Sequence, residues 1–373
     1  MNARAPHANP WLSREKAELG ALLSLPGIGN GRLRDMLALF GSPAGAWEAV
    51  LQGAAAGPDP SAGSWSEIAG RTDPGRLAER LESERMTLIT IGEDDYPAAL
   101  REIHDPPLAV FLRGRLAPEK PSIAIVGMRK ATAYGLEAAR WLARGLAAAG
   151  LSVVSGAAYG IDAAAHNGAL EASGHTCAVL GAGVDVVYPR SHAKLFARIE
   201  ESGALLSEYF PGTEPRPYQF PARNRIIAGL SRAVIVVEAG ERSGALITAE
   251  LALAEGRDVL AVPGQVFSPA SRGTHKLLRA GAAIVTSPDE VLEELGLDVF
   301  SGAPAGATDS TEGLRPDEVS ILAALDSGPT DVESIAGAAG LHVARAVSLL
   351  GEMELARLVT RAAGNRYQKC SPR

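Results

Sequence analysis

Four cationic side chains occur near the ends of apolar runs in the middle of the chain, where strands are expected to give way to glycine turns. In a parallel sheet, ligands bind at the carboxyl ends of the strands, because helix N-termini there offer free N–H groups and a positive dipole end. Backbone donors and two adjacent cations can share one phosphate at such a place. The cations are Arg129, Lys130, Arg223 and Arg225, and the neighbouring turns are Ser155–Gly156 and Ser243–Gly244. The pattern predicts a phosphate-binding site.

The segment from Tyr209 to Arg225 interleaves aromatic rings with arginines. Single-stranded nucleic acid is bound by this combination, because the cations track the backbone and each stacked base contributes roughly 1–3 kcal/mol. A structural explanation stays open, in which Arg223 pairs with Glu208 or Glu238 and the rings lie in the core. Several arginines at adjacent strand ends favour phosphate binding.

Motifs for catalysis are absent from the sequence. It has no Gly-Lys dipeptide and hence no P-loop, the first strand turn reads GMRKATAYG and lacks the GxGxxG fingerprint, and no serine lies in a GxSxG elbow. The seven histidines lack metal-ligand spacing. His166 follows Asp162 by four residues, so we expect a structural pair in which Asp162 caps a helix and His166 hydrogen-bonds to it. We predict no catalytic residue, no metal site and no cofactor.

Short β-branched runs alternate with helix-period segments between Ser122 and Glu250. Strands are expected in SIAIVGMRKATAYG, LSVVSGAAYGIDAAAH, TCAVLGAGVDVVYP, QFPARNRIIAGLS and AVIVVEAGERSGALITAE, then in DVLAVPGQ and AAIVTS. A strand, a short helix and another strand are expected ahead of them, from Met86 to Gly114. Near-continuous apolar strands alternating with helices indicate a mostly parallel sheet covered on both faces. The predicted fold class is therefore α/β, with a Rossmann-like doubly wound sheet.

The length of 373 residues exceeds one ordinary domain. We predict a helical N-terminal domain over 1–80, an extended Rossmann-like core over 81–297, a flexible linker over 298–316 and a winged-helix domain over 317–373. The first contains a Pro-Gly-Ile-Gly turn between two helices, which resembles a helix-hairpin-helix unit; DNA contact and simple helix capping both stay open for it. In the last, Arg345 is nearly the only cation of the third helix, so DNA reading, protein contact and helix packing stay open.

The charge and cysteine content limit the class of protein. The net charge is −7, so a nucleic-acid partner must be bound by a local basic groove. The two cysteines, Cys177 and Cys370, are typical of a reduced intracellular protein. The N-terminus lacks the apolar core of a signal peptide, and no run approaches the ~20 apolar residues of a membrane span. We predict a cytoplasmic protein with no membrane partner.

Five motifs carry a family resemblance. In this order and spacing, IAIVGMRKAT-YG, SGAAYGIDAAAH, FPARNRIIAGLS, VVEAGERSGALITA and AVPG closely resemble the DNA-processing protein A (DprA/Smf) family. The resemblance covers Tyr96 to Leu295. The family's architecture extends over the whole chain and implies a sterile-alpha-motif-like or helix-hairpin-helix N-terminal domain, a Rossmann-like core and a C-terminal winged helix. It implies binding of single-stranded DNA, a homodimer formed through the core, and loading of the RecA recombinase onto incoming DNA in natural transformation. It also implies no catalytic turnover.

The family's binding motifs map onto this chain residue by residue. The predicted DNA-binding residues are Gly127, Arg129, Lys130, Thr132, Ser155, Gly156, Gly160, Phe220, Arg223, Asn224, Arg225, Ser243 and Gly244. Asp162 and Thr248 match the same motifs. Tyr159 stands where many members carry Arg, which removes a cation and could add a stacking ring. Ala245 replaces a common Ser or Thr, which loses one hydroxyl contact.

Two alternative functions differ in class. A nucleotide phosphoribohydrolase of the lysine-decarboxylase-like type shares a similar sheet, and SGALITAE loosely resembles its Gly-Gly-x-Gly-Thr turn, with Glu250 as the catalytic candidate. The paired glycines are missing, and such an enzyme has no use for the terminal domains. A sequence-specific regulator would read DNA through the winged helix, and the nearly neutral third helix argues against it.

Overall fold

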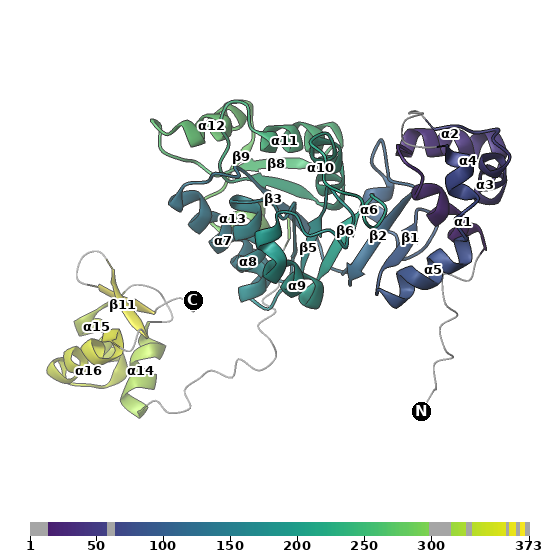
Figure 1. The fold of residues 1–373 in the computed structure, drawn as a ribbon. Helices are drawn as coiled ribbons and strands as arrows, with labels where there is room; N and C mark the ends of the chain where they lie inside the picture. The colour runs from purple at the N-terminus through teal and green to yellow at the C-terminus, as the bar shows by residue number, and fades with distance from the viewer. Residues whose placement is uncertain are drawn as a thin grey trace, which may run out of the picture. The chain divides into compact units, whose positions relative to one another are not determined.

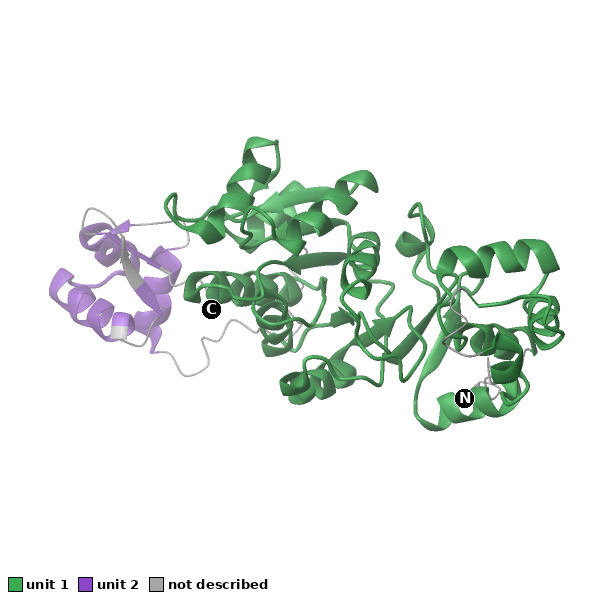
Figure 2. Ribbon diagram, turned by 45° about the horizontal axis from the view of Figure 1, so that its top comes forward, with its two compact units in different colours: residues 1–301 green, residues 302–373 purple. Residues whose placement is uncertain are grey.

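The computed structural model describes residues 14–57, 64–297, 315–325, 330–355, 358–362 and 366–369. The chain divides into two compact units, Met1–Ser301 and Gly302–Arg373 (Figure 2). The predicted linker lies outside the described residues from 298 to 314, and Arg315 and Pro316 already belong to the first turn of the next helix.

The N-terminal part of unit 1 is helical, as predicted. Its described helices are α1 (Arg14–Leu23), α2 (Asn30–Phe40), α3 (Pro43–Leu51), α4 (Trp65–Ala69) and α5 (Pro74–Ser83). They bury Leu22, Leu33 and Trp47 in one cluster with Leu88 and Phe111 of the adjoining strands. Because this apolar surface is shared, the helices and the sheet edge form one compact unit, and the domain boundary predicted at 80/81 falls inside α5.

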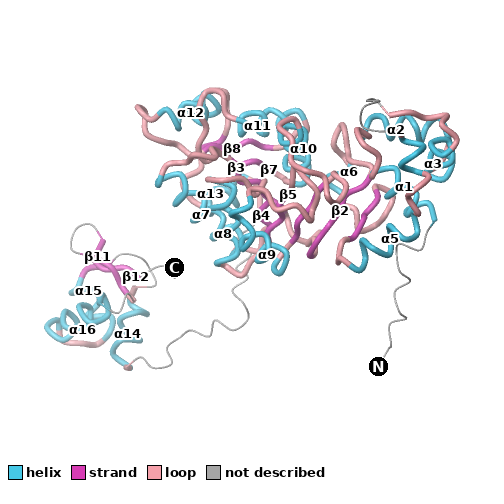
Figure 3. Tube along the Cα trace, in the orientation of Figure 1, coloured by secondary structure: helices cyan, strands magenta, loops and turns pink. Residues whose placement is uncertain are grey.

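Among the described residues of unit 1, the sheet has nine strands in the order β1-β2-β6-β5-β4-β3-β7-β8-β9. Figure 3 shows its strands in magenta with helices in cyan packed around them. The strands are β1 (Thr87–Thr90), β2 (Ala109–Gly114), β3 (Ser122–Val126), β4 (Ser152–Ser155), β5 (Thr176–Val179), β6 (Ala204–Ser207), β7 (Ala233–Val236), β8 (Asp258–Ala261) and β9 (Ala283–Ile284). The pairs β1–β2 and β2–β6 are antiparallel, and every other pair is parallel. The mostly parallel α/β prediction is confirmed.

Helices cover both faces of the sheet (Figure 1). One face carries α7 (Ala133–Ala148), α8 (Ile161–Glu171), α9 (Ala193–Ser202) and α13 (Pro288–Glu294); the other carries α6 (Ala98–Arg101), α10 (Gln219–Leu230), α11 (Gly244–Ala254) and α12 (Arg272–Arg279). Short 3-10 turns span η3 (Arg190–His192) and η4 (Pro269–Ser271). In β3, Ile123 and Ile125 face α7 and α8, whereas Ala124 and Val126 face α10 and α11. This alternation follows from the two-residue period of a strand.

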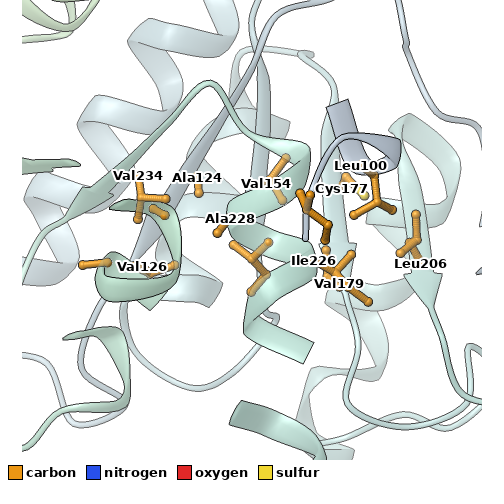
Figure 4. Packing of buried hydrophobic residues seen from close by; sticks show 14 of the residues in the cluster. Leu100, Ala124, Val126, Val154, Cys177, Val179, Leu206, Ile226, Ala228 and Val234 are labelled. Carbon is orange, nitrogen blue, oxygen red and sulfur yellow. The ribbon is translucent and has the colours of Figure 1, made fainter. Parts of the chain in front are cut away.

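The prediction of a strand in QFPARNRIIAGLS was wrong, because this segment forms helix α10. Its apolar run is too short to distinguish a strand from a buried helix by pattern alone. In the fold, Ile226 and Ala228 pack against Val154, Cys177 and other residues of the sheet face (Figure 4). The prediction did not include β6, whose four residues follow α9 after one intervening residue.

Unit 2 has the predicted winged-helix outline of three helices and a hairpin. Its described elements are α14 (Pro316–Ala324), β10 (Thr330–Asp331), α15 (Val332–Ala339), α16 (Val343–Leu355), β11 (Val359–Ala362) and β12 (Arg366–Lys369). Ile321, Ile335 and Leu349 are among the residues that form its core. Arg345 of the third helix lies 3.5 Å from the carboxylate of Asp317, so its charge is partly neutralised within the unit.

Candidate nucleic-acid interface

The sheet has a topological switch point between β3 and β7. The chain leaves β3 toward β4, β5 and β6 on one side, and it leaves β7 toward β8 and β9 on the other. Val126 and Val236 lie side by side at the carboxyl ends of the two strands. Crossovers diverge at such a point and leave a crevice for ligands. A pocket of about 740 Å³, which we call the switch-point pocket, opens there.

The switch-point pocket is lined mainly by the loop after β3, by α10 and by the start of α11, with further residues from the start of α8 and the loop after β5. The pocket brings together the predicted residues Gly127, Arg129, Lys130, Phe220, Arg223, Asn224, Ser243 and Gly244, with Asp162 and Thr248. The remaining predicted residues do not line it; they are Thr132, Ser155, Gly156, Gly160 and Arg225.

The loop after β3 is tied closely to the end of β7. A Cβ atom at Gly127 would lie 2.5 Å from Ile161 Cγ1 and 2.9 Å from the Glu238 carbonyl oxygen, so only glycine fits. Thr132 caps α7 by accepting a hydrogen bond from the Gly135 N–H, at 3.1 Å. Its own N–H and hydroxyl donate to the buried Glu238 carboxylate, at 2.9 and 2.5 Å. Thr132 therefore shapes the loop, with its polar atoms already used.

Arg129 and Lys130 are exposed at the mouth of the pocket, and neither forms an ion pair within the described part of the chain. The Arg129 guanidinium lies over the Phe220 ring, 5.2 Å from its centroid. The ring orients the cation without neutralising it. Arg242 also lines the pocket without an ion pair among these residues. The pocket therefore presents positive charge that is free to meet a phosphate.

An aromatic pair continues from the cation into the pocket. The Phe220 and Tyr188 ring centroids are 5.5 Å apart, and Tyr188 is 44% exposed. Tyr188 and Arg242 were missed by the sequence reasoning. Both positions could have been noticed in the sequence, because Tyr188 follows the apolar pair Val186–Val187 in the loop after β5 and Arg242 precedes the Ser243–Gly244 turn. The exposed Tyr188 ring beside free cations can stack a base while the cations bind the backbone phosphates.

Helix α11 points its N-terminus at the same pocket. Ser243 is its N-cap and accepts a hydrogen bond from the Ala245 N–H, at 3.3 Å. At Gly244, a Cβ atom would meet no heavy atom within 4 Å, so the first turn is open. The free N–H groups and the positive end of the helix dipole favour an anion here.

Arg223 forms the floor of the pocket and is 4% exposed. Its guanidinium donates to the carbonyl oxygens of Gly156, at 3.0 Å, and Val179. It makes no ion pair with Glu208 or Glu238. Burial lowers the pKa of Arg223 to about 10, so it stays cationic at neutral pH. Its charge adds to the field in the pocket, while its donors fasten α10 to the ends of β4 and β5.

The predicted pairing of Asp162 with His166 was wrong. His166 Nδ1 lies 2.7 Å from Thr176 Oγ1, and Asp162 accepts from the Ala158 N–H at 3.3 Å. Burial lowers the pKa of His166 to about 3, so the ring is neutral and held in the core. Burial also raises the pKa of Asp162, although the nearby positive charge of Arg223 acts to lower it. Ser155 is likewise internal, since its hydroxyl donates to the Ile125 carbonyl oxygen at 2.7 Å.

Gly160 packs against the loop after β3, whose residues Met128 and Arg129 line the pocket. Its φ is +76°, and a Cβ atom would lie 2.2 Å from the Met128 carbonyl oxygen and 2.7 Å from that of Arg129. We expect Gly160→Ala to lower the free energy of unfolding by more than about 1 kcal/mol, because strain and a backbone clash add. Urea unfolding measures this. Gly244→Ala is the matched control and should leave stability unchanged; equal stability of both variants would contradict the close packing at Gly160.

Arg225 faces away from the pocket into an ion-pair network. Its guanidinium donates to both carboxylate oxygens of Glu208, at 2.9 and 2.6 Å, and to the side chain and carbonyl of Asp105, each at 3.0 Å. Asp105 also accepts from Arg34 and Asn30 of α2, at 2.9 and 2.7 Å. The network joins α10 to the helix after the Pro-Gly-Ile-Gly turn. Arg225 is thus placed with structural partners, unlike Arg129.

Comparisons with known proteins agree with this geometry. A model of the family described as DNA recombination-mediator protein A matches residues 87–296, and a DprA winged helix domain matches residues 305–365. Protein Smf of Escherichia coli is 40% identical over 295 residues, which cover 76% of this chain and 78% of that protein. The DNA processing protein DprA of Streptococcus pneumoniae is 43% identical over 243 residues, covering 62% of this chain and 86% of that protein.

Two solved structures resemble the fold. The X-ray structure of DNA processing protein A from Streptococcus pneumoniae has a TM-score of 0.64 at 37% identity and covers 74% of this chain and 97% of its own. DNA processing protein A from Helicobacter pylori, described for its single-stranded DNA binding mode, has a TM-score of 0.52 at 30% identity; the match covers 57% of this chain and 97% of that one.

Proposed function

Because the chain belongs to the DNA-processing protein A (DprA/Smf) family, we propose that it binds single-stranded DNA in the switch-point pocket and delivers it to the RecA recombinase. The family gives the chain a DNA-processing role. One observation supports binding of single-stranded DNA in particular: unneutralised cations, two neighbouring aromatic rings and the open N-terminus of α11 meet in one pocket. The relative from Helicobacter pylori, described as binding single-stranded DNA, supports the same ligand class.

The pocket suits a single strand better than a duplex. The exposed Tyr188 ring offers a face to an unpaired base, and a duplex keeps its bases stacked on each other. Arg129, Lys130 and Arg242 lie at one strand-end edge, where one phosphate backbone can follow them. Since the net charge of the chain is −7, this local field has to supply the attraction.

We expect tight binding of single strands, weaker binding of duplex and little binding of a mononucleotide. Fluorescence anisotropy with a labelled oligothymidylate, the matched duplex and AMP measures all three. Affinity for the single strand should fall as salt rises, because counterions are released in proportion to the phosphates contacted. Equal affinity for duplex and single strand would contradict the proposal.

Delivery of DNA to RecA and self-association belong to the same proposal. Exposed apolar side chains outside the switch-point pocket occur on α11, in the loop after β8 and on β9. They are Leu253, Val266, Phe267 and Ile284. Their burial in a homodimer would remove apolar surface from water. Sedimentation of the full chain tests the dimer, and a monomer would refute it. RecA filament formation on DNA coated with single-strand-binding protein tests the delivery, and filaments that form no faster with this protein would refute it.

We infer no catalytic turnover. Glu250, the catalytic candidate of the phosphoribohydrolase alternative, is exposed on α11 and does not line the switch-point pocket. Release of adenine from AMP that disappears in Glu250→Gln would support that alternative. Within the residues that the structure describes, no single helix is long and apolar enough to cross a membrane; α15 and α16 reach that length and composition only as a pair bent by 104°.

A further inference from the structure

A second pocket lies along the same edge of the sheet. Val126, Val236, Ala261 and Ile284 are neighbours in register across β3, β7, β8 and β9. The switch-point pocket opens beyond the first two strands. The second pocket, of about 650 Å³, opens beyond the last two, against helix α7. We call it the α7 pocket. From β3 to β9 the edge spans about 14 Å, three strand spacings.

Two aromatic residues of α7 line the α7 pocket. Trp141 is 42% exposed although it is the largest apolar side chain of the helix. Tyr134 is held at the pocket wall, because its hydroxyl donates to the Pro263 carbonyl oxygen at 2.8 Å. Tyr134 lies four residues after Lys130 of the switch-point pocket, so the first turn of α7 connects the two pockets.

The charges of the α7 pocket balance. Arg140 is bound to Glu171, with its Nε 2.7 Å from a carboxylate oxygen. Arg144 and Glu137 line the pocket without an ion pair in the described residues. Two cations and two anions give no net attraction for phosphate. The pocket therefore offers a ring face and apolar walls, and it differs in this from the cationic switch-point pocket.

We propose that the α7 pocket is a second subsite for the same single strand, in which a base stacks on Trp141. The proposal rests on the proposed function. A DNA strand whose phosphates are bound by Arg129 and Lys130 crosses the first turn of α7, and one of its later bases stacks on the indole of Trp141. Base stacking on an aromatic side chain needs no sequence and little charge. The subsite thus adds affinity only for strands long enough to reach both pockets.

The length of the DNA strand distinguishes binding at the α7 pocket from binding at the switch-point pocket alone. Anisotropy titrations use oligothymidylates of about 4 and about 16 nucleotides, the range of known single-strand site sizes. Trp141→Ala should leave the affinity for the short oligonucleotide unchanged. It should weaken binding of the long oligonucleotide about fivefold or more, which corresponds to the low end of the stacking energies. Trp141→Phe keeps a ring and should restore most of the loss. Leu136→Ala, equally exposed on the same helix and outside the pocket, should change neither strand.

Two further readouts test the chemistry. Because the subsite binds a base, Trp141→Ala should keep the salt dependence of the parent, which follows the number of phosphates contacted. Glu137→Gln removes a negative charge from the proposed path of the DNA. It should therefore raise the affinity for the long oligonucleotide and leave the affinity for the short one unchanged. If Trp141→Ala does not change binding of the long oligonucleotide, the subsite is refuted, and the pocket would instead bind a protein partner. Failure of the parent protein to bind either strand would instead overturn the proposed function.

Discussion

Replacing Arg129 with alanine is expected to weaken the binding of every single strand at least tenfold while leaving the protein as stable as before. Its guanidinium is exposed, lies over the Phe220 ring and has no ion pair within the described residues. A charge-assisted hydrogen bond contributes about 1.5–3 kcal/mol, and a planar guanidinium can grip two phosphate oxygens where lysine cannot. The salt dependence should fall by roughly one unit, because one phosphate contact is lost.

The measurement pairs a titration with a melting curve of the same variant. Arg232→Ala is a matched control, since Arg232 is exposed and directly precedes β7, at the opposite edge of the sheet from the pocket. It should bind like the parent. A large drop in the melting temperature of Arg129→Ala, with near-parental DNA affinity, would show that Arg129 serves the fold and would remove it from the site.

Replacing Arg225 with alanine is expected to have the opposite outcome. Arg225 is 13% exposed and Glu208 is 14% exposed, so the substitution leaves a nearly buried carboxylate without its cation. Removing one partner of such a pair costs about 3 kcal/mol, the low end for buried pairs, because Asp105 is partly exposed. The melting temperature should fall by roughly 5–10 °C, while the folded variant should bind single strands nearly as well as the parent.

Differential scanning calorimetry beside anisotropy distinguishes the two arginines. Arg34→Ala is the control within the same network: its side chain is 36% exposed, so its pair with Asp105 should contribute no more than about 1 kcal/mol. Unchanged melting of Arg225→Ala with lost DNA affinity would restore the phosphate role that the sequence suggested for this residue.

Local patterns were sufficient for the fold class and for part of the site. The apolar run of β3 followed by Gly127 and two cations specifies a strand end with phosphate-binding chemistry, because strand period and glycine turns are properties of adjacent residues. The helices and hairpin of unit 2 were predicted from the same kind of pattern. For QFPARNRIIAGLS the pattern was ambiguous, and packing on the sheet face selected a helix. The site therefore uses side chains of α10 where strand ends were expected.

Only the tertiary structure decided what each candidate side chain contacts. Arg129 and Arg225 both lie in motifs of the family and carry the same charge. Arg225 nevertheless forms ion pairs with Asp105 and Glu208, which lie 120 and 17 residues away in the chain. His166 meets Thr176 and not the Asp162 four residues before it. Coulomb and hydrogen-bond energies depend on distances in space of a few ångströms. Sequence spacing fixes those distances only within one helix or strand, so the partners of a charge become known when the elements are packed together.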